Sequence, residues 1–160
     1  MKVPPIKLSE VYSNLGTAYY VMKKYNEALR SYETMINNYS VNFITNYIYM
    51  ADCQNRLGLE RSIPIIDEDK YINAPDDIKI IYKYFLLSKD IPVFVKQNYI
   101  MKKVLPNLVD SELIDIFKFE LNNLVKISNH YKLLHLFNEY INEKKELMFC
   151  VKKTNYSKIK

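Results

Sequence analysis

Glycine is scarce in this chain, with only Gly16 and Gly58 among 160 residues. Tight hairpins, phosphate-cradling loops and strained nucleophile turns all rely on glycine, because glycine adopts positive φ angles at little steric cost. The scarcity therefore disfavours sheet-rich and nucleotide-binding folds. We expect an all-α protein.

The groupings of residues that catalysis and metal binding require are also lacking. Cys53 and Cys150 lie far apart in sequence with no histidine at metal-ligand spacing, which predicts reduced core thiols. His130 and His135 are five residues apart, so on one helix they point to different faces. There is no Gly-x-Ser-x-Gly motif and no glycine-rich loop before a helix. We predict no enzyme activity, no cofactor and no metal site.

Arginine is scarce and the positive charge is not clustered in the folded part. The net charge is +5, but the last nine residues hold Lys152, Lys153, Lys158 and Lys160, which carry four of these charges. A nucleic-acid groove needs several basic side chains on one face. We therefore expect no nucleic-acid contact, and a solvated, frayed basic tail over residues 150–160.

Long apolar runs are missing as well. No run approaches the roughly 18 residues of a membrane helix, so we expect no membrane contact. The first six residues have one basic side chain and no apolar core, which argues against a secretory signal and favours the cytoplasm. A chain of this length is the size of one domain, which we place at residues 1–149.

Helical periodicity is clear in the first third of the chain. Apolar residues recur every three or four positions over residues 9–23, with Ser9 as a candidate cap, and again over residues 25–36. Two helices joined by so short a break must lie antiparallel and side by side.

The spacing within this helix pair resembles the tetratricopeptide repeat, which has aromatic, Leu-Gly and Ala positions at fixed offsets within 34 residues. Residues 9–42 match it at Tyr12, Leu15, Gly16, Tyr19, Tyr25, Ala28 and Tyr32, and depart from it at Met35 and Ser40. A degenerate second repeat over residues 43–66 places Ala51 in register with Gly16, and Gly58 at the turn. Pro64 and residues 67–70 cut its second helix short. Gly16 and Ala28 are small where we expect the two helices to approach most closely.

Four further helices follow the repeats. A helix start at residues 73–77 precedes a helix to about residue 89, and others cover about 91–105, 110–127 and 130–148. We expect residues 110–112, Asp-Ser-Glu, to cap the helix over residues 110–127. In all we expect about eight helices. The resemblance implies that they stack as antiparallel pairs in a right-handed α-solenoid.

The resemblance also implies where a ligand would bind. In such stacks the first helix of each pair lines a concave face, which here includes Glu10, Thr45 and Ile48. The polar side chains on this face suit an extended peptide, although they would also suit a merely solvated surface. The predicted peptide-binding residues are Ser13, Asn14, Thr17, Tyr20, Asp52, Asn55 and Arg56.

Two functional hypotheses follow. The first is a module that binds a peptide or protein segment, because the chain is similar in style to the sensor domains of peptide-responsive bacterial transcription regulators. Ser13 and Thr17 replace the Lys and Asn of the carboxylate clamp in this family, so chaperone tails are not the expected partner. The alternative is a structural scaffold that self-associates as a homodimer without a small ligand.

Overall fold

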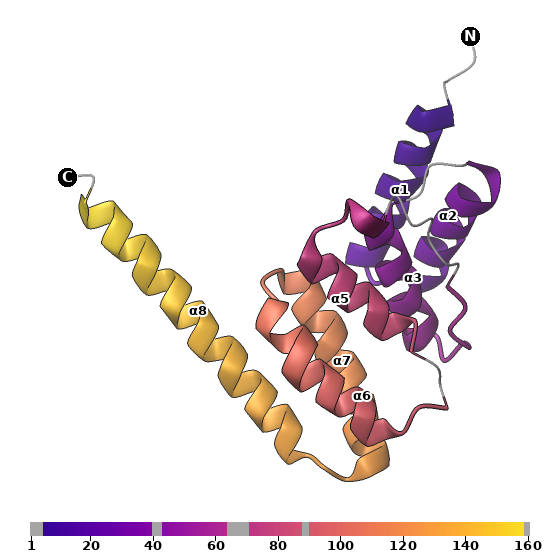
Figure 1. The fold of residues 1–160 in the computed structure, drawn as a ribbon. Coiled ribbons are helices and arrows are strands. Elements are labelled where there is room, and N and C mark those ends of the chain that lie inside the picture. Colours follow the sequence, from indigo (N-terminus) through magenta and orange to yellow (C-terminus); the bar gives the residue numbers. More distant parts are fainter. Residues whose placement is uncertain (1–4, 40–42, 64–70, 88–89, 159–160) are drawn as a thin grey trace. The chain divides into compact units, whose positions relative to one another are not determined.

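The computed structural model describes residues 5–39, 43–63, 71–87 and 90–158. These residues contain no strand, which confirms the all-α prediction, and they form seven α-helices rather than about eight (Figure 1). The helices are α1 (Pro5–Val21), α2 (Tyr25–Asn38), α3 (Ile44–Arg56), α5 (Asp76–Phe85), α6 (Val93–Tyr99), α7 (Ser111–Ser128) and α8 (Lys132–Lys158). A π-helical turn, η1 (Ile100–Val104), and a 3-10 turn, η2 (Leu105–Asn107), follow α6.

The chain divides into two compact units, Met1–Asp90 and Ile91–Lys160. The first contains α1, α2, α3 and α5, and the second contains α6, α7 and α8. The division falls inside residues 1–149, where we expected one domain. Compactness alone does not establish independent folding, so the single domain stays a prediction.

The first helix begins one turn earlier than its expected cap. Pro5 is its first residue, a position that suits proline because the first N–H groups of a helix have no partner within it. Ser9 is therefore inside α1, where it is fully buried, and it does not cap the helix. The prediction of a Ser9 cap is wrong, whereas the helix itself is confirmed.

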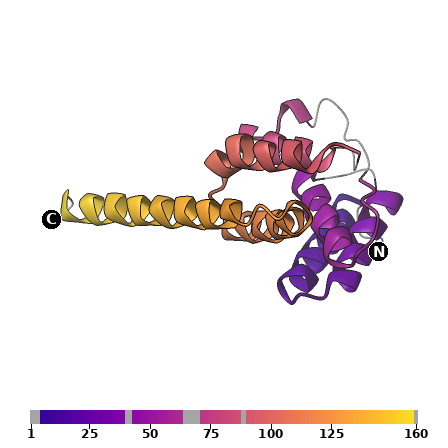
Figure 2. The same cartoon turned by 90° about the horizontal axis from the view of Figure 1, so that it is seen from below.

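Helices α1 and α2 lie side by side, as the spacing predicted (Figures 1 and 2). A Cβ atom placed on Gly16 would lie 2.5 Å from Cε1 of Tyr32, which is closer than real Cβ atoms approach a ring carbon. The Tyr32 side chain is fully buried, and so is Ala28 on the same helix. The ring of Tyr32 thus occupies the space that the missing side chain of Gly16 leaves open.

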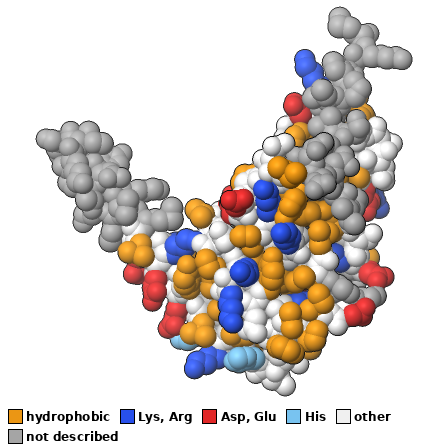
Figure 3. All heavy atoms as spheres, in the orientation of Figure 1, with side chains coloured by type: hydrophobic (Ala, Val, Ile, Leu, Met, Phe, Trp, Pro, Cys, Tyr) orange, Lys and Arg blue, Asp and Glu red, His pale blue; other side chains and the backbone are white. Residues whose placement is uncertain are grey.

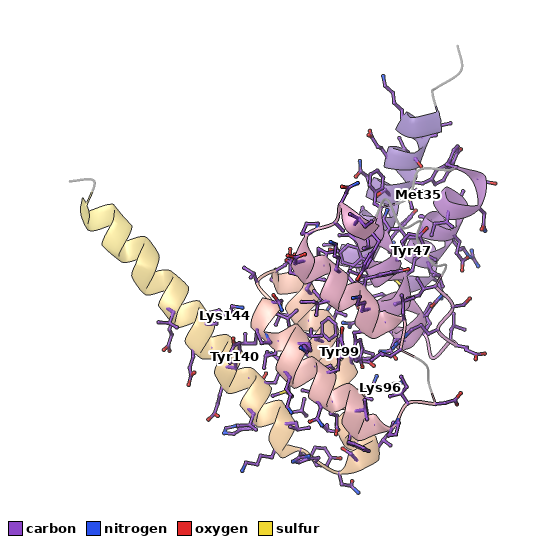
Figure 4. The ribbon with its side chains drawn as sticks, in the orientation of Figure 1. Met35, Tyr47, Lys96, Tyr99, Tyr140 and Lys144 are labelled. Carbon is purple, nitrogen blue, oxygen red and sulfur yellow. The ribbon has the colours of Figure 1, made fainter. Side chains whose placement is uncertain are left out.

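Helix α3 continues the core of the first unit. Met35 of α2 and Tyr47 of α3 are buried, and both are labelled in Figure 4. The Asn46 side chain donates a hydrogen bond to Met35 Sδ at 3.4 Å. On its other side, Tyr47 meets Tyr82 of α5 edge to face, with ring centroids 6.3 Å apart. The predicted partner helix of α3, near Pro64, lies largely outside the described residues.

Helices α1 and α3 end with the same backbone cap. Lys23 and Gly58, which share a position in the expected repeat register, both adopt the left-handed conformation, with φ of 60° and 68°. The closing hydrogen bonds run from Lys24 N–H to Tyr19 C=O (2.9 Å) and from Leu59 N–H to Gln54 C=O (2.8 Å). This six-residue closure is the Schellman motif, which favours glycine at the left-handed position.

Lys23→Gly should therefore stabilise the chain. A left-handed backbone costs a non-glycine residue roughly 1 kcal/mol, part of which is offset by the greater freedom of glycine in the unfolded chain. We expect the free energy of unfolding to rise by about 0.5 kcal/mol in urea titrations. The reciprocal change, Gly58→Lys, should lower it, although a Cβ at Gly58 meets nothing within 4 Å. A destabilised Lys23→Gly variant would contradict this description of the cap.

In the second unit, α7 packs against both α6 and α8. The Asp110 carboxylate accepts a hydrogen bond from the Glu112 N–H at 2.9 Å, which confirms the predicted cap at the start of α7. Asn129, with φ of 59°, ends the helix in the left-handed conformation. Asparagine tolerates this conformation better than most residues.

Helix α8 continues to Lys158 and does not end near Met148. The expected frayed tail is therefore wrong for residues 150–158, which are helical. No glycine or proline occurs between Lys132 and Lys158, so the sequence contains no strong stop signal there. Among the helices of the described residues, none is both long enough and apolar enough to cross a membrane.

Candidate functional site

Five of the seven polar residues predicted to line a concave groove instead contact other helices, and they are Ser13, Thr17, Tyr20, Asp52 and Arg56. Residues 13, 17 and 20 follow one face of α1, since they are three or four positions apart. Their side chains meet polar side chains of α2 and α3. We call this set the polar seam, and its members are Ser13, Thr17, Tyr20, Tyr25, Tyr32, Asn46, Asp52 and Arg56.

At one end of the seam, Asp52 is the residue that the other side chains surround. Its side chain is 1% exposed, and it accepts hydrogen bonds from the Tyr20 hydroxyl and from Arg56 Nε, the latter at 2.8 Å. Arg56 also donates to the Tyr25 hydroxyl at 3.1 Å, with its guanidinium over the Tyr25 ring. A buried carboxylate is tolerable only when it is paired and hydrogen-bonded in this way.

Burial, reinforced by the negative charge of Asp52, raises the pKa of Tyr20 far above its ordinary value. The phenol therefore remains protonated and continues to donate to Asp52. Tyr20 is near the end of α1, and Asp52 is in α3, 32 residues further along the chain. This hydrogen bond therefore connects the two helices. The interaction thus stabilises the packing of the two helices.

The other end of the seam uses hydroxyl and amide groups. Asn46 donates from Nδ2 to Ser13 Oγ at 3.0 Å, which connects α3 to α1. Thr17 Oγ1 lies 3.0 Å from the Ser13 carbonyl, to which it donates, and 3.2 Å from the Tyr32 hydroxyl. The hydroxyls of Ser13 and Thr17 are therefore used in packing.

The seven predicted binding residues separate by exposure. Tyr20 and Asp52 are buried and inaccessible to a peptide in this conformation. The structure brings both together with Arg56. Asn14 is exposed. The other four predicted residues are half-buried, and they are Ser13, Thr17, Asn55 and Arg56.

An open depression of about 340 Å³ lies beside the Ser13 end of the seam. It is lined by Glu10, Ser13 and Asn14 of α1 and by Phe43 and Thr45 at the start of α3. Glu10, Asn14 and Thr45 are exposed, and Phe43 is 37% exposed. A carboxylate, an amide, hydroxyls and an aromatic ring therefore meet within one small site.

Phe43 is the one lining residue that the sequence did not indicate. It precedes α3 in extended conformation, with φ of −106° and ψ of 127°, so helical periodicity does not apply to it. The volume is at the lower end of the range for small-molecule pockets, which begins at about 300 Å³. The depression can therefore accept a few side chains of a peptide, and Glu10 favours a basic group among them.

Cys53 lies next to the polar seam and is fully buried. Burial, reinforced by the negative charge of Asp52, raises the pKa of the Cys53 thiol to about 12. In a Cys150→Ser variant, we expect iodoacetamide at pH 8 to label Cys53 only after denaturation, as followed by mass spectrometry. Rapid labelling of the folded chain would contradict this burial.

The same shift in pKa has a consequence for stability. The unfolded thiol ionises near pH 8.5, whereas the folded thiol does not, so the unfolded state binds fewer protons above that pH. The contribution of Cys53 to the free energy of unfolding is complete below about pH 8.5 and falls as the pH rises toward 12.

Within the described part of the chain, no group of three or more His, Cys, Asp or Glu side chains is placed to hold a metal ion.

Comparison with known proteins gives no match to a family model, a curated protein or a solved structure. The tetratricopeptide resemblance therefore depends on residues 9–42 and on the register of the second repeat.

Proposed function

We propose that the Met1–Asp90 unit is a tetratricopeptide-type module that binds a peptide or protein segment. The observation that carries the proposal is the open depression between the middle of α1 and the start of α3. Helices α1 and α2 are antiparallel, and α3 ends with the same cap as α1. A repeat of this type would produce such an arrangement.

The chemistry of the depression suits a peptide. The Asn14 amide can donate and accept, so it can pair with a peptide N–H or C=O group. The Glu10 carboxylate can pair with a lysine, an arginine or a peptide amino terminus. Phe43 offers an apolar surface beside these polar groups, and such a combination fixes both the affinity and the orientation of a ligand.

The polar seam supports this site, and of its members Ser13 alone lines the depression. Its hydrogen bonds hold α1 against α3, so the lining side chains are positioned before a ligand arrives. A preformed site loses less conformational entropy on binding than a flexible one. We therefore assign the ligand contacts to Glu10, Asn14, Phe43 and Thr45, and assign a supporting role to the seam.

Two finer proposals depend on the family resemblance alone. One is that the helices of the whole chain stack as a right-handed α-solenoid. The other is that the chain is the sensor half of a peptide-responsive transcription regulator. The second proposal implies that peptide binding is read by another domain or partner.

Selection of peptides from a random display library on the full chain would test the proposal. Peptides that are recovered would be measured by calorimetry against the wild type and against the double variant Glu10→Gln/Asn14→Ala. We expect at least a tenfold loss of affinity, because a hydrogen bond to a charged group contributes about 1.5–3 kcal/mol.

The matched control is Glu33→Gln/Asn37→Ala, which changes the same residue types at exposed positions of α2. This variant should bind with wild-type affinity. Equal affinity of all three proteins, or a library that yields no binding peptide, would refute the assigned site.

A further inference from the structure

The turn between α7 and α8 is exposed along its whole length. All seven residues from 126 to 132 are exposed, and Asn129 ends α7 among them. Ile127 and Tyr131 are the apolar side chains of this turn, and they are 69% and 54% exposed. Single exposed apolar side chains are common on protein surfaces, so their neighbours decide whether they form a contact surface.

The start of α6 lies beside this turn. The Gln97 side chain is buried and donates a hydrogen bond to Ser128 Oγ at 2.7 Å. The His130 N–H donates to the same hydroxyl oxygen at 3.2 Å, so Ser128 connects α6 to the turn. Phe94 lies one turn before Gln97 on α6 and is 63% exposed. Figure 1 shows the first turn of α6 next to the α7–α8 turn.

The charge at this end of the second unit has one sign. Residues 121–138 contain Lys126, Lys132 and both histidines, but no aspartate or glutamate. Residues 91–109, which include all of α6, contain three lysines and no acidic residue. In Figure 3 the histidines, in pale blue, lie beside basic side chains at the lower edge of the view, and acidic side chains follow along α8.

Three acidic residues border these two ranges in sequence. Glu120 is buried. Glu139 lies two turns beyond Lys132 on α8, and its carboxylate is 3.0 Å from Nε2 of His135. Asp90 belongs to the first unit. The charges of the turn itself are therefore those of its basic residues. We call the exposed apolar and lysine side chains at this end the exposed tip, and its members are Phe94, Lys126, Ile127, Tyr131 and Lys132.

We propose that the exposed tip docks on a membrane surface that contains anionic lipids. Its apolar side chains would enter the headgroup layer, where aromatic rings are favoured, and its lysines would lie beside the anionic headgroups. The sequence led us to expect no membrane contact because it lacks a spanning run, but docking at the surface needs no such run. This inference is independent of peptide binding by the first unit.

Two other anionic partners fit the exposed tip less well. A nucleic acid would attract the lysines and could stack on the aromatic rings, but it would leave the aliphatic side chain of Ile127 uncovered. An acidic protein would need a cavity that is complementary in shape to a protruding turn. A headgroup layer adapts to the side chains that enter it, so it meets both requirements.

Cosedimentation of the full chain with lipid vesicles tests the proposal. We expect the wild type to bind phosphatidylcholine–phosphatidylserine vesicles and not vesicles of phosphatidylcholine alone. Two variants, Ile127→Ser/Tyr131→Ser and Lys126→Gln/Lys132→Gln, should each bind at least about tenfold more weakly, since each removes two of the side chains that meet the lipid.

Matched controls change the same kinds of side chain elsewhere in the second unit. Val109 and Leu147 are 59% and 67% exposed, and Lys118 and Lys145 are exposed as well. Val109→Ser/Leu147→Ser and Lys118→Gln/Lys145→Gln should therefore bind like the wild type. Circular dichroism would establish that each variant keeps its helix content.

Fluorescence locates the contact, because the chain contains no tryptophan. Tyr131→Trp introduces a single indole at the exposed tip, and its emission should shift to shorter wavelength when phosphatidylserine vesicles are added. Leu147→Trp places the indole outside the exposed tip, and its emission should not shift.

Several results would overturn the proposal. These are a wild type that binds neither kind of vesicle or both equally, including one that binds single-stranded DNA or polyglutamate instead. Wild-type binding by either variant of the exposed tip, weakened binding by either control, or an unshifted emission of Tyr131→Trp would do the same.

Discussion

Gly16→Val is expected to lower the free energy of unfolding by about 3 kcal/mol, the upper end of the usual range for overpacking a core. Even one added carbon would lie 2.5 Å from the Tyr32 ring, and that ring is fully buried and surrounded by other side chains. The closest contact is to the ring itself, which cannot bend away as the end of a flexible side chain would. Urea titration followed by circular dichroism measures the loss.

Two further variants separate the packing effect from helix propensity. Ala18→Val introduces the same side chain at an exposed position of α1 and should cost less than about 0.7 kcal/mol. Tyr32→Leu shortens the opposing side chain, so Gly16→Val should cost less in that background than in the wild type. Equal losses for Gly16→Val and Ala18→Val would show that Gly16 is not a close-approach position.

Asp52→Ala should destabilise the chain by about 3–5 kcal/mol, the usual cost of removing one partner of a buried ion pair. The variant takes from the Arg56 guanidinium its carboxylate partner at 2.8 Å, and from the Tyr20 hydroxyl its acceptor. Asp52→Asn should lose less, because the amide oxygen can still accept one hydrogen bond. Thermal and urea unfolding would measure both variants.

Asp76 is the matched control, because it forms an exposed ion pair. Its side chain is 98% exposed and lies 3.7 Å from Lys79. Asp76→Ala should therefore change the free energy of unfolding by less than about 1 kcal/mol. If Asp52→Ala cost no more than Asp76→Ala, the polar seam would not be a stabilising element.

The helix pair could be predicted because its determinants are local in sequence. The spacing of Gly16, Ala28 and Tyr32 predicts two helices packed side by side, and the structure confirms this pair. Likewise, the Asp110 cap depends only on the residues that follow it. In these two cases the residues act on near neighbours in the chain, so their identity was sufficient.

The role of the polar residues on α1 and α3 could not be predicted in the same way. Periodicity shows which residues share a helix face, but it does not show whether a polar face meets solvent or another helix. Tyr20 and Asp52 are 32 positions apart, so their contact depends on how α1 and α3 pack. One local signal was present, since Asp52 and Arg56 have the spacing of a helical ion pair.

The start of α1 and the end of α8 differ from expectation for a related reason. Ser9 has the chemistry of a cap, but Pro5 allows the helix to begin earlier. The lysines of the tail are compatible with both a frayed and a helical terminus, and no glycine or proline ends α8 before Lys158. Neither boundary is determined by composition alone.

The close approach of Gly16 and Tyr32 can be measured directly by NMR spectroscopy. With Gly16 and the tyrosine rings isotopically labelled, we predict strong nuclear Overhauser effects between the Gly16 Hα protons and the Tyr32 ring protons. The Gly16 Hα resonances should also be displaced from random-coil values by the ring current. Random-coil shifts for Gly16, with no Overhauser effect to Tyr32, would contradict the packing of α1 on α2 and with it the site between α1 and α3.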